Sequence, residues 1–157
     1  MKFLATLVFS APLLAQSFQI VPSTAPHGGA GSLLITLNAP AGKEPLGLQW
    51  KLLLGTGVTA ALQDIVAGGA AAAAGKAVTC APADKIAPDG STYNCILIGG
   101  EKHIANGTIF LVKYRIRPAT TPQTLVVHIS DGLAVLGHAN ELRQVSVPPA
   151  EGTITVR

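Results

Sequence analysis

The sequence predicts an all-β domain, a sandwich or a barrel, that follows a signal peptide. Short runs rich in leucine and β-branched residues alternate with Gly, Pro, Asn and Asp, which is typical of strands joined by turns. No segment has a convincing amphipathic helical pattern. Many short strands at this spacing indicate a sandwich or a barrel rather than a parallel α/β sheet.

The strands are predicted from these runs in chain order. The clearest are residues 32–38, 46–54, 93–98, 107–116, 124–130 and 152–157. Weaker ones are residues 18–21, 62–66, 78–81, 133–136 and 145–147.

Alternation within the run 46–54 predicts which of its side chains are buried. Successive side chains of a strand point to opposite faces. Leu48, Trp50 and Leu52 share the apolar face, so we expect them in the core. Gln49 and Lys51 share the polar face and are expected at the surface.

The run 107–116 alternates in the same way. Phe110, Val112 and Tyr114 are expected to point inward, and Lys113 outward. Ile109 falls on the outward side of this pattern. With Trp50 and Tyr114 inside, Tyr93 is the clearest candidate for an exposed aromatic residue. A single exposed aromatic residue is weak evidence for a sugar-binding platform.

The N-terminus has the pattern of a secretory signal peptide. Lys2 is followed by an apolar run over residues 3–15 and then by small residues. The run is too short for a membrane span of ~20 residues. We expect bacterial export with cleavage after Ser17, or else after Ala15. The mature chain, residues 18–157, is then one secreted or cell-surface domain with no membrane span.

Composition argues against some classes of partner. Only 12% of residues are charged and the formal net charge is +3. No basic run suggests nucleic acid, and no acidic tail is present. No cofactor is predicted.

The alanine-rich segment 67–77 does not fit a strand. Its five consecutive alanines favour helix, but the flanking glycines and short length make an isolated helix marginal. We predict a loop, with or without a helical turn, that crosses between the sheets. It is not a phosphate-binding loop, because Gly69 is one residue too far from Gly75 and Ala77 lacks a hydroxyl.

The two cysteines, Cys80 and Cys95, are predicted to form a disulfide. In an oxidising compartment a pair of cysteines most simply forms a disulfide bond. A zinc site needs two further ligands that the sequence does not offer, and a redox pair normally has Cys-x-x-Cys spacing. A turn at Pro88-Asp89-Gly90 brings the two cysteines together in a long hairpin-like excursion.

No catalytic or metal-binding motif is complete. His128, Ser130 and Asp131 supply the residue types of a triad, but triads assemble in space and local spacing proves nothing. Asp131-Gly132 is interpreted as a turn. Asn106-Gly-Thr is formally a glycosylation acceptor, and we favour a turn before a strand there as well. We therefore predict that the protein is not an enzyme and holds no metal.

Three segments resemble cohesin-like domains, which are related to some carbohydrate-binding modules. Residues 46–68 are similar to an early strand with an inward aromatic residue, a turn and a short strand that ends in glycine. Residues 93–116 are similar to the paired central strands. Residues 151–157 resemble the closing strand, with Gly152, Ile154 and Val156. Where the family usually has Tyr-Asp-Pro, this chain has Leu54-Gly55-Thr56-Gly57.

The resemblance implies a nine-stranded jelly-roll β-sandwich that serves as a non-catalytic recognition module. Its partner would be another protein or a second copy of the chain, with extracellular polysaccharide as the alternative. In cohesins one sheet face meets the partner, and that face includes the outward side of the strand that matches residues 46–54. The resemblance therefore implies Gln49 and Lys51 as the candidate partner face.

Overall fold

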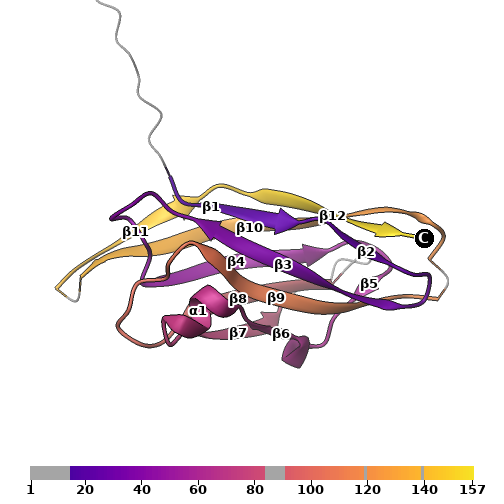
Figure 1. Ribbon diagram of the computed structural model, residues 1–157, viewed down its shortest axis with the longest axis horizontal. Coiled ribbons are helices and arrows are strands. Elements are labelled where there is room, and N and C mark those ends of the chain that lie inside the picture. The colour runs from indigo at the N-terminus through magenta and orange to yellow at the C-terminus, as the bar shows by residue number, and fades with distance from the viewer. Residues whose placement is uncertain (1–14, 84–90, 119, 139) are drawn as a thin grey trace, which may run out of the picture.

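The computed structural model describes residues 15–83, 91–118, 120–138 and 140–157. Residues 1–14 of the expected signal peptide and the expected turn at 88–90 lie outside this range. The described part is a sandwich of two mainly antiparallel sheets, as Figure 1 shows. The predicted jelly-roll sandwich class is confirmed. No helix among the described residues is long and apolar enough to cross a membrane.

The first sheet has five strands. Its order is β1-β3-β9-β5, and β6 also pairs with β9. These strands are β1 (Ser17–Val21), β3 (Ala30–Asn38), β5 (Val58–Thr59), β6 (Ile65–Ala67) and β9 (Gly107–Ile116).

The second sheet has seven strands. Its order is β2-β12-β10-β4-β8-β7, with β11 also paired to β10. These strands are β2 (Ser23–Ala25), β4 (Gly47–Leu54), β7 (Ala77–Pro82), β8 (Ser91–Ile98), β10 (Gln123–His138), β11 (Glu141–Val147) and β12 (Ala150–Val156).

Two short helices lie between β5 and β7. The 3₁₀ helix η1 (Leu62–Asp64) takes up most of the weak strand predicted at 62–66, of which only β6 remains. The helix α1 (Gly69–Ala73) follows and packs beside β9. The segment 67–77 thus crosses from the first sheet to the second with one helical turn, as predicted.

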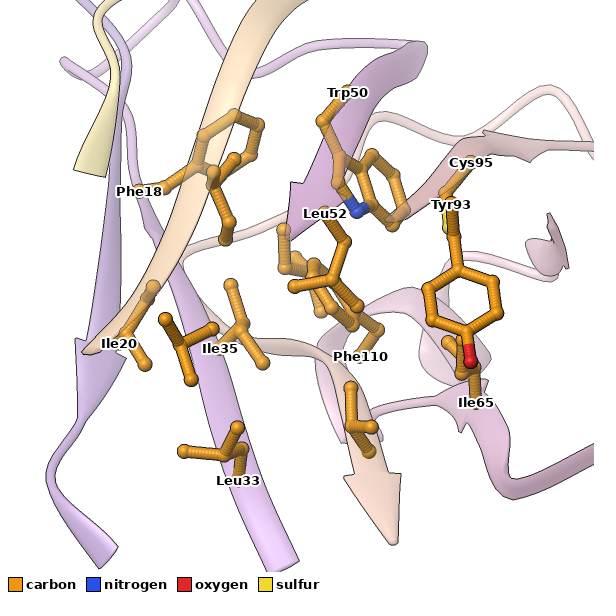
Figure 2. Close-up of a cluster of buried hydrophobic side chains, with 14 of the residues drawn as sticks. Phe18, Ile20, Leu33, Ile35, Trp50, Leu52, Ile65, Tyr93, Cys95 and Phe110 are labelled. Carbon is orange, nitrogen blue, oxygen red and sulfur yellow. The ribbon is translucent and has the colours of Figure 1, made fainter. Parts of the chain in front are cut away.

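The core between the sheets is built on stacked aromatic rings (Figure 2). Trp50 is 1% exposed and its ring stacks on Phe110 at 4.4 Å between ring centroids. Phe18 of β1 meets the same indole edge-on at 6.2 Å. The inward positions predicted from alternation at Trp50 and Phe110 are therefore confirmed.

Alternation failed at Ile109, which is fully buried although the pattern put it outside. The register between β3 and β9 shifts at this point, so that Ile35 pairs with Phe110 and Thr36 with Thr108. A bulge of this kind adds a residue to one strand and breaks the period of two. The helix α1 lies against the same part of β9.

The Asp131-Gly132 turn is a second wrong prediction. Both residues lie inside the 16-residue strand β10, where the pairing with β4 shifts between Ser130 and Leu133. Asp131 has a positive φ of 51°. Asp-Gly tolerates this conformation as well in a bulge as in a turn, so the dipeptide alone does not distinguish the two.

The predicted disulfide between Cys80 and Cys95 is present. The two residues are direct cross-strand neighbours in the pairing of β7 with β8. Cys95 is fully buried. Since β7 pairs with no other strand among the described residues, the disulfide fastens this edge strand to the sheet.

Candidate functional site

The outward side of β10, β4, β8 and β7 forms one continuous surface, which we call the outer face. Gln49 lies between Leu133 of β10 and Ile96 of β8 in the strand register. Lys51 lies between Ser130 and Asn94 in the same way. The structure thus brings both predicted partner-face residues to the middle of this sheet, on its solvent side.

One half of the outer face is polar. Lys51 Nζ lies 2.7 Å from Asp131 Oδ2, and these side chains are 41% and 66% exposed. Further along the strands, His128 Nδ1 lies 3.0 Å from Glu151 Oε1. Exposed ion pairs of this kind contribute at most ~1 kcal/mol to stability. The charges of Lys51 and Asp131 are therefore available to a partner at little cost to the fold.

The other half of the outer face is apolar. Ile96, Ile98, Leu133 and Val135 surround Gly47. Ile98 is 53% exposed, and the missing side chain at Gly47 leaves a hollow of about 100 Å³ between these residues. A flat sheet face with a small apolar hollow can accept one protruding aliphatic side chain.

A larger, shallow hollow of about 530 Å³ lies across the polar half. Lys51, Asp131, Asn94 and Thr79 are among the residues that line it. The disulfide lies on the core side of β7 and β8, where Cys95 is fully buried, and it holds together the two strands that carry Thr79 and Asn94. The outer face as a whole combines a charged hollow with an adjoining apolar one.

The apolar half was missed in the sequence. The signal was present in the run 93–98, where Asn94, Ile96 and Ile98 alternate with the core side chains of Tyr93, Cys95 and Leu97. A strand that covers a core needs apolar side chains only on the face that points to the core. Apolar side chains on the opposite face as well therefore predict a second contact surface.

Tyr93 is not the exposed aromatic residue that the sequence suggested. It is 7% exposed, and its hydroxyl donates a hydrogen bond to the backbone oxygen of Ala60 at 2.6 Å. Its register partner is Leu52, which points into the core, so Tyr93 must point inward as well. Figure 2 shows Tyr93 among the side chains of the buried hydrophobic cluster.

The residue types of a triad are present but do not act together. The His128 imidazole contacts Glu151, and the Asp131 carboxylate contacts Lys51. Each of the two is thus paired with a different partner. No group of three or more His, Cys, Asp or Glu residues in the described part of the chain is placed to hold a metal ion.

The Asn106 side chain acts as a backbone-like pairing group. Its Oδ1 accepts a hydrogen bond from the Ala39 N–H at 2.7 Å, and its Nδ2 donates to the Ala39 oxygen at 3.1 Å. The amide therefore ties the segment just before β9 to the residue that follows β3.

Sequence comparison does not place the chain, because no family model and no curated protein matches it. Comparison with solved structures does find matches. The seventh ScaB type I cohesin from Pseudobacteroides cellulosolvens superposes with a TM-score of 0.73 at 14% identity, covering 91% of this chain and 92% of that one. The chain has the cohesin fold.

Other cohesins give the same result across the full length. A non-cellulosomal cohesin from the archaeon Archaeoglobus fulgidus has a TM-score of 0.64 at 11% identity, with 91% of both chains covered. The sixth cohesin of scaffoldin B from Acetivibrio cellulolyticus, solved with a dockerin, has a TM-score of 0.69 at 10% identity, with coverages of 91% and 99%. At these identities the likeness extends to the fold alone.

Proposed function

We propose that this cohesin-fold protein is a secreted, non-catalytic recognition module that binds another protein through its outer face. The proposal rests on one observation: the apolar half and the polar half of the outer face adjoin on the same sheet. Aliphatic side chains around Gly47 lie beside the charged hollow at Lys51 and Asp131. Protein interfaces combine an apolar centre with polar groups that set register and partner choice.

Two observations support export. The N-terminal residues have the composition of a signal peptide. The disulfide between Cys80 and Cys95 suits an oxidising compartment. Together they favour a protein that works outside the cell or at the cell surface.

Cohesins solved with dockerins support a protein as the partner. The alternative, a polysaccharide, has less support. Trp50, Tyr93 and Tyr114 are all buried, so none of them offers a flat ring for a sugar to stack on. We therefore infer that a protein, either another chain or a second copy of this one, covers the outer face.

The proposal is tested by affinity capture from the native secretome, with analytical ultracentrifugation to detect self-association. The test variant is Lys51→Glu with Ile98→Glu, which reverses the charge in one half and places a charge in the other. We expect it to retain the partner at least ten times more weakly than the wild type, because it disrupts both halves at once.

The matched control is Lys113→Glu with Leu34→Glu, two exposed residues on the outward side of the first sheet. It makes the same changes of charge and polarity away from the outer face and should retain the partner fully. Equal losses in the two double variants, or a protein that captures no partner and does not self-associate, would contradict the proposal.

A further inference from the structure

A second cleft lies at one end of the sandwich, away from the predicted partner residues. Three segments meet there: the turn before β4, the loop between β8 and β9, and the end of the β10–β11 hairpin. The cleft encloses about 350 Å³, and we call it the end cleft. Its charged and titratable lining residues are Lys43, Glu44, His103, His138 and Arg143.

The backbone at Lys43 is held in a turn. Its N–H donates to the oxygen of Pro40 at 2.9 Å, closing a turn in which Gly42 has a φ of 77°. If the chain is cleaved after Ala15 and so keeps Gln16, the Lys43 oxygen also accepts a hydrogen bond of 2.7 Å from Gln16 Nε2. A chain cleaved after Ser17 lacks this contact. A fixed backbone restricts where the ammonium group of Lys43 can reach, which lowers the entropic cost of using it to bind a ligand.

The opposite side of the end cleft is equally fixed. Arg143 lies in β11 and pairs with Leu136 of β10. The His103 Nε2 is 3.0 Å from the oxygen of Gly137. Because a carbonyl oxygen can only accept, Nε2 must carry the hydrogen, and Nδ1 is the ring nitrogen left for a ligand. The His138 ring packs edge-on against His103 at 5.4 Å between ring centroids.

The charge of the end cleft is not balanced internally. Neither Lys43 nor Arg143 forms a salt bridge with any residue that the structure describes. Glu44 is the one carboxylate in the lining. Lys43 and Arg143 outnumber this single carboxylate in the lining, so the end cleft attracts an anion. The guanidinium of Arg143 can hold a carboxylate with two parallel hydrogen bonds.

A second, apolar hollow lies on the other side of the same two histidines. It encloses about 420 Å³ and is lined by Leu46, Leu142, Gly100 and Glu101 in addition to the histidines. Leu142 is 59% exposed, the most exposed of the large hydrophobic residues in the described part of the chain. The two histidines thus line both the cationic hollow and this second one, in which Leu46 and Leu142 lie beside the Glu101 carboxylate.

We propose that this end of the sandwich binds a peptide in which an acidic residue stands next to an aliphatic one. The carboxylate lies between Lys43 and Arg143, and the aliphatic side chain packs on Leu46 and Leu142. Leucine side chains suit an aliphatic residue, and no Trp, Tyr or Phe lines either hollow for a sugar ring to stack on, so the peptide is favoured over an acidic polysaccharide. The site shares no lining residue with the two hollows of the outer face.

The test uses an acetylated, amidated decapeptide of Gly and Ser with a central Glu-Leu pair, titrated into the isotope-labelled protein and followed by NMR. We expect saturable shifts at the backbone amides of Gly42, Lys43, Gly137 and Arg143. Peptides with Gln-Leu or Glu-Ser at the centre should each bind at least ten times more weakly, because each lacks one of the two recognised groups.

Two pairs of variants separate this site from general charge attraction. Lys43→Ala with Arg143→Ala should weaken binding at least tenfold. Lys113→Ala with Arg115→Ala removes the same two charges from the first sheet and should change binding less than twofold. All four residues are exposed, so the fold should tolerate both pairs.

Three results would overturn the proposal. The first is the absence of saturable shifts at the named amides with millimolar peptide. The second is an equal loss of affinity in both variant pairs, which means that only net charge attracts the peptide. The third is tighter binding of trigalacturonate than of the Glu-Leu peptide at these amides, which assigns the end cleft to an acidic sugar.

Discussion

At the scale of single residues, Tyr114 shows how a missing side chain makes room for a large one. It lies opposite Gly31 in the β3–β9 pairing, and a Cβ atom on Gly31 would come within 2.3 Å of the Tyr114 hydroxyl. The ring is 1% exposed, and its hydroxyl is 2.7 Å from Ser23 Oγ in the other sheet. Burial raises the pKa of Tyr114 above its ordinary value of 10.0, and the Ser23 hydrogen bond offsets only part of this effect.

The raised pKa of Tyr114 predicts a loss of stability in alkali. Above pH 10.0 the unfolded chain releases the phenol proton while the folded protein still holds it. The unfolded state then binds fewer protons, so the free energy of unfolding falls as the pH rises. The protonated Tyr114 phenol contributes fully to the free energy of unfolding below pH 10.0. This contribution is lost as the pH rises through the pKa of Tyr114 in the folded protein. Tyr114→Phe removes this dependence.

Urea unfolding from pH 7 to 11 measures the effect as a difference between the wild type and Tyr114→Phe. At pH 7 the variant should be about 1 kcal/mol less stable, because it lacks the hydrogen bond to Ser23. The difference in free energy of unfolding between the wild type and Tyr114→Phe should become smaller above pH 10, because only the wild type loses stability through Tyr114. The lowered pKa of the buried Lys76 ammonium is common to both proteins and cancels. Parallel curves over the whole range would show that Tyr114 is not the group responsible.

At the scale of secondary-structure elements, β10 shows how far the sequence could predict the fold. Alternation gave the buried side of β4 and most of β9, because a period of two holds wherever a strand is regular. It failed at Ile109, where a bulge breaks that period, and a second bulge lies at Asp131, where a turn was expected. Two predicted strands with a turn between them are in fact the single strand β10, which carries β4 on one side and β12 and β11 on the other.

The candidate site was predictable only in part, for the same reason. Gln49 and Lys51 could be assigned to the solvent side from β4 alone. Asp131, the partner of Lys51, could not be found without knowing that β10 pairs with β4. Tyr93 was misplaced because its inward direction is set by the register with Leu52, which the sequence of β8 alone does not contain.

The disulfide between Cys80 and Cys95 should stabilise the edge of the second sheet. Its cysteines are 15 residues apart, and closing a loop of that size is worth about 3 kcal/mol in the chain-entropy model. We expect Cys80→Ala with Cys95→Ala to lower the melting temperature by roughly 6–12 °C for a domain of this size. The double variant should still fold, since β7 and β8 keep their backbone pairing.

Calorimetry of the wild type with and without a reducing agent provides the control. The reduced wild type should melt within a few degrees of the double variant, because both lack the same cross-link. The variant itself should not respond to the reducing agent. An unchanged melting temperature after complete reduction, verified by thiol titration, would mean that the disulfide does not stabilise the folded state.

At the scale of the whole molecule, one aromatic stack joins the two sheets. Trp50 belongs to β4 of the second sheet and Phe110 to β9 of the first, and their rings lie nearly parallel with an interplanar angle of 17°. Both side chains are almost completely buried. The outer face and the first sheet therefore depend on a contact that a single substitution can remove.

Phe110→Ala should destabilise the whole sandwich by about 3–5 kcal/mol, because it removes a buried ring and leaves a cavity against the indole. Trp50 is the only tryptophan, so its fluorescence reports the loss directly in a urea titration. Leu34→Ala, on the outward side of the same sheet and 41% exposed, is the control and should cost less than about 1 kcal/mol.

Since the stack joins the two layers, the fluorescence transition and the far-ultraviolet circular dichroism transition should coincide in each protein. If the fluorescence of Phe110→Ala changed well before its circular dichroism, the sheets would be separating while their strands stayed paired. In that case the stack would hold the layers together without setting the stability of either one.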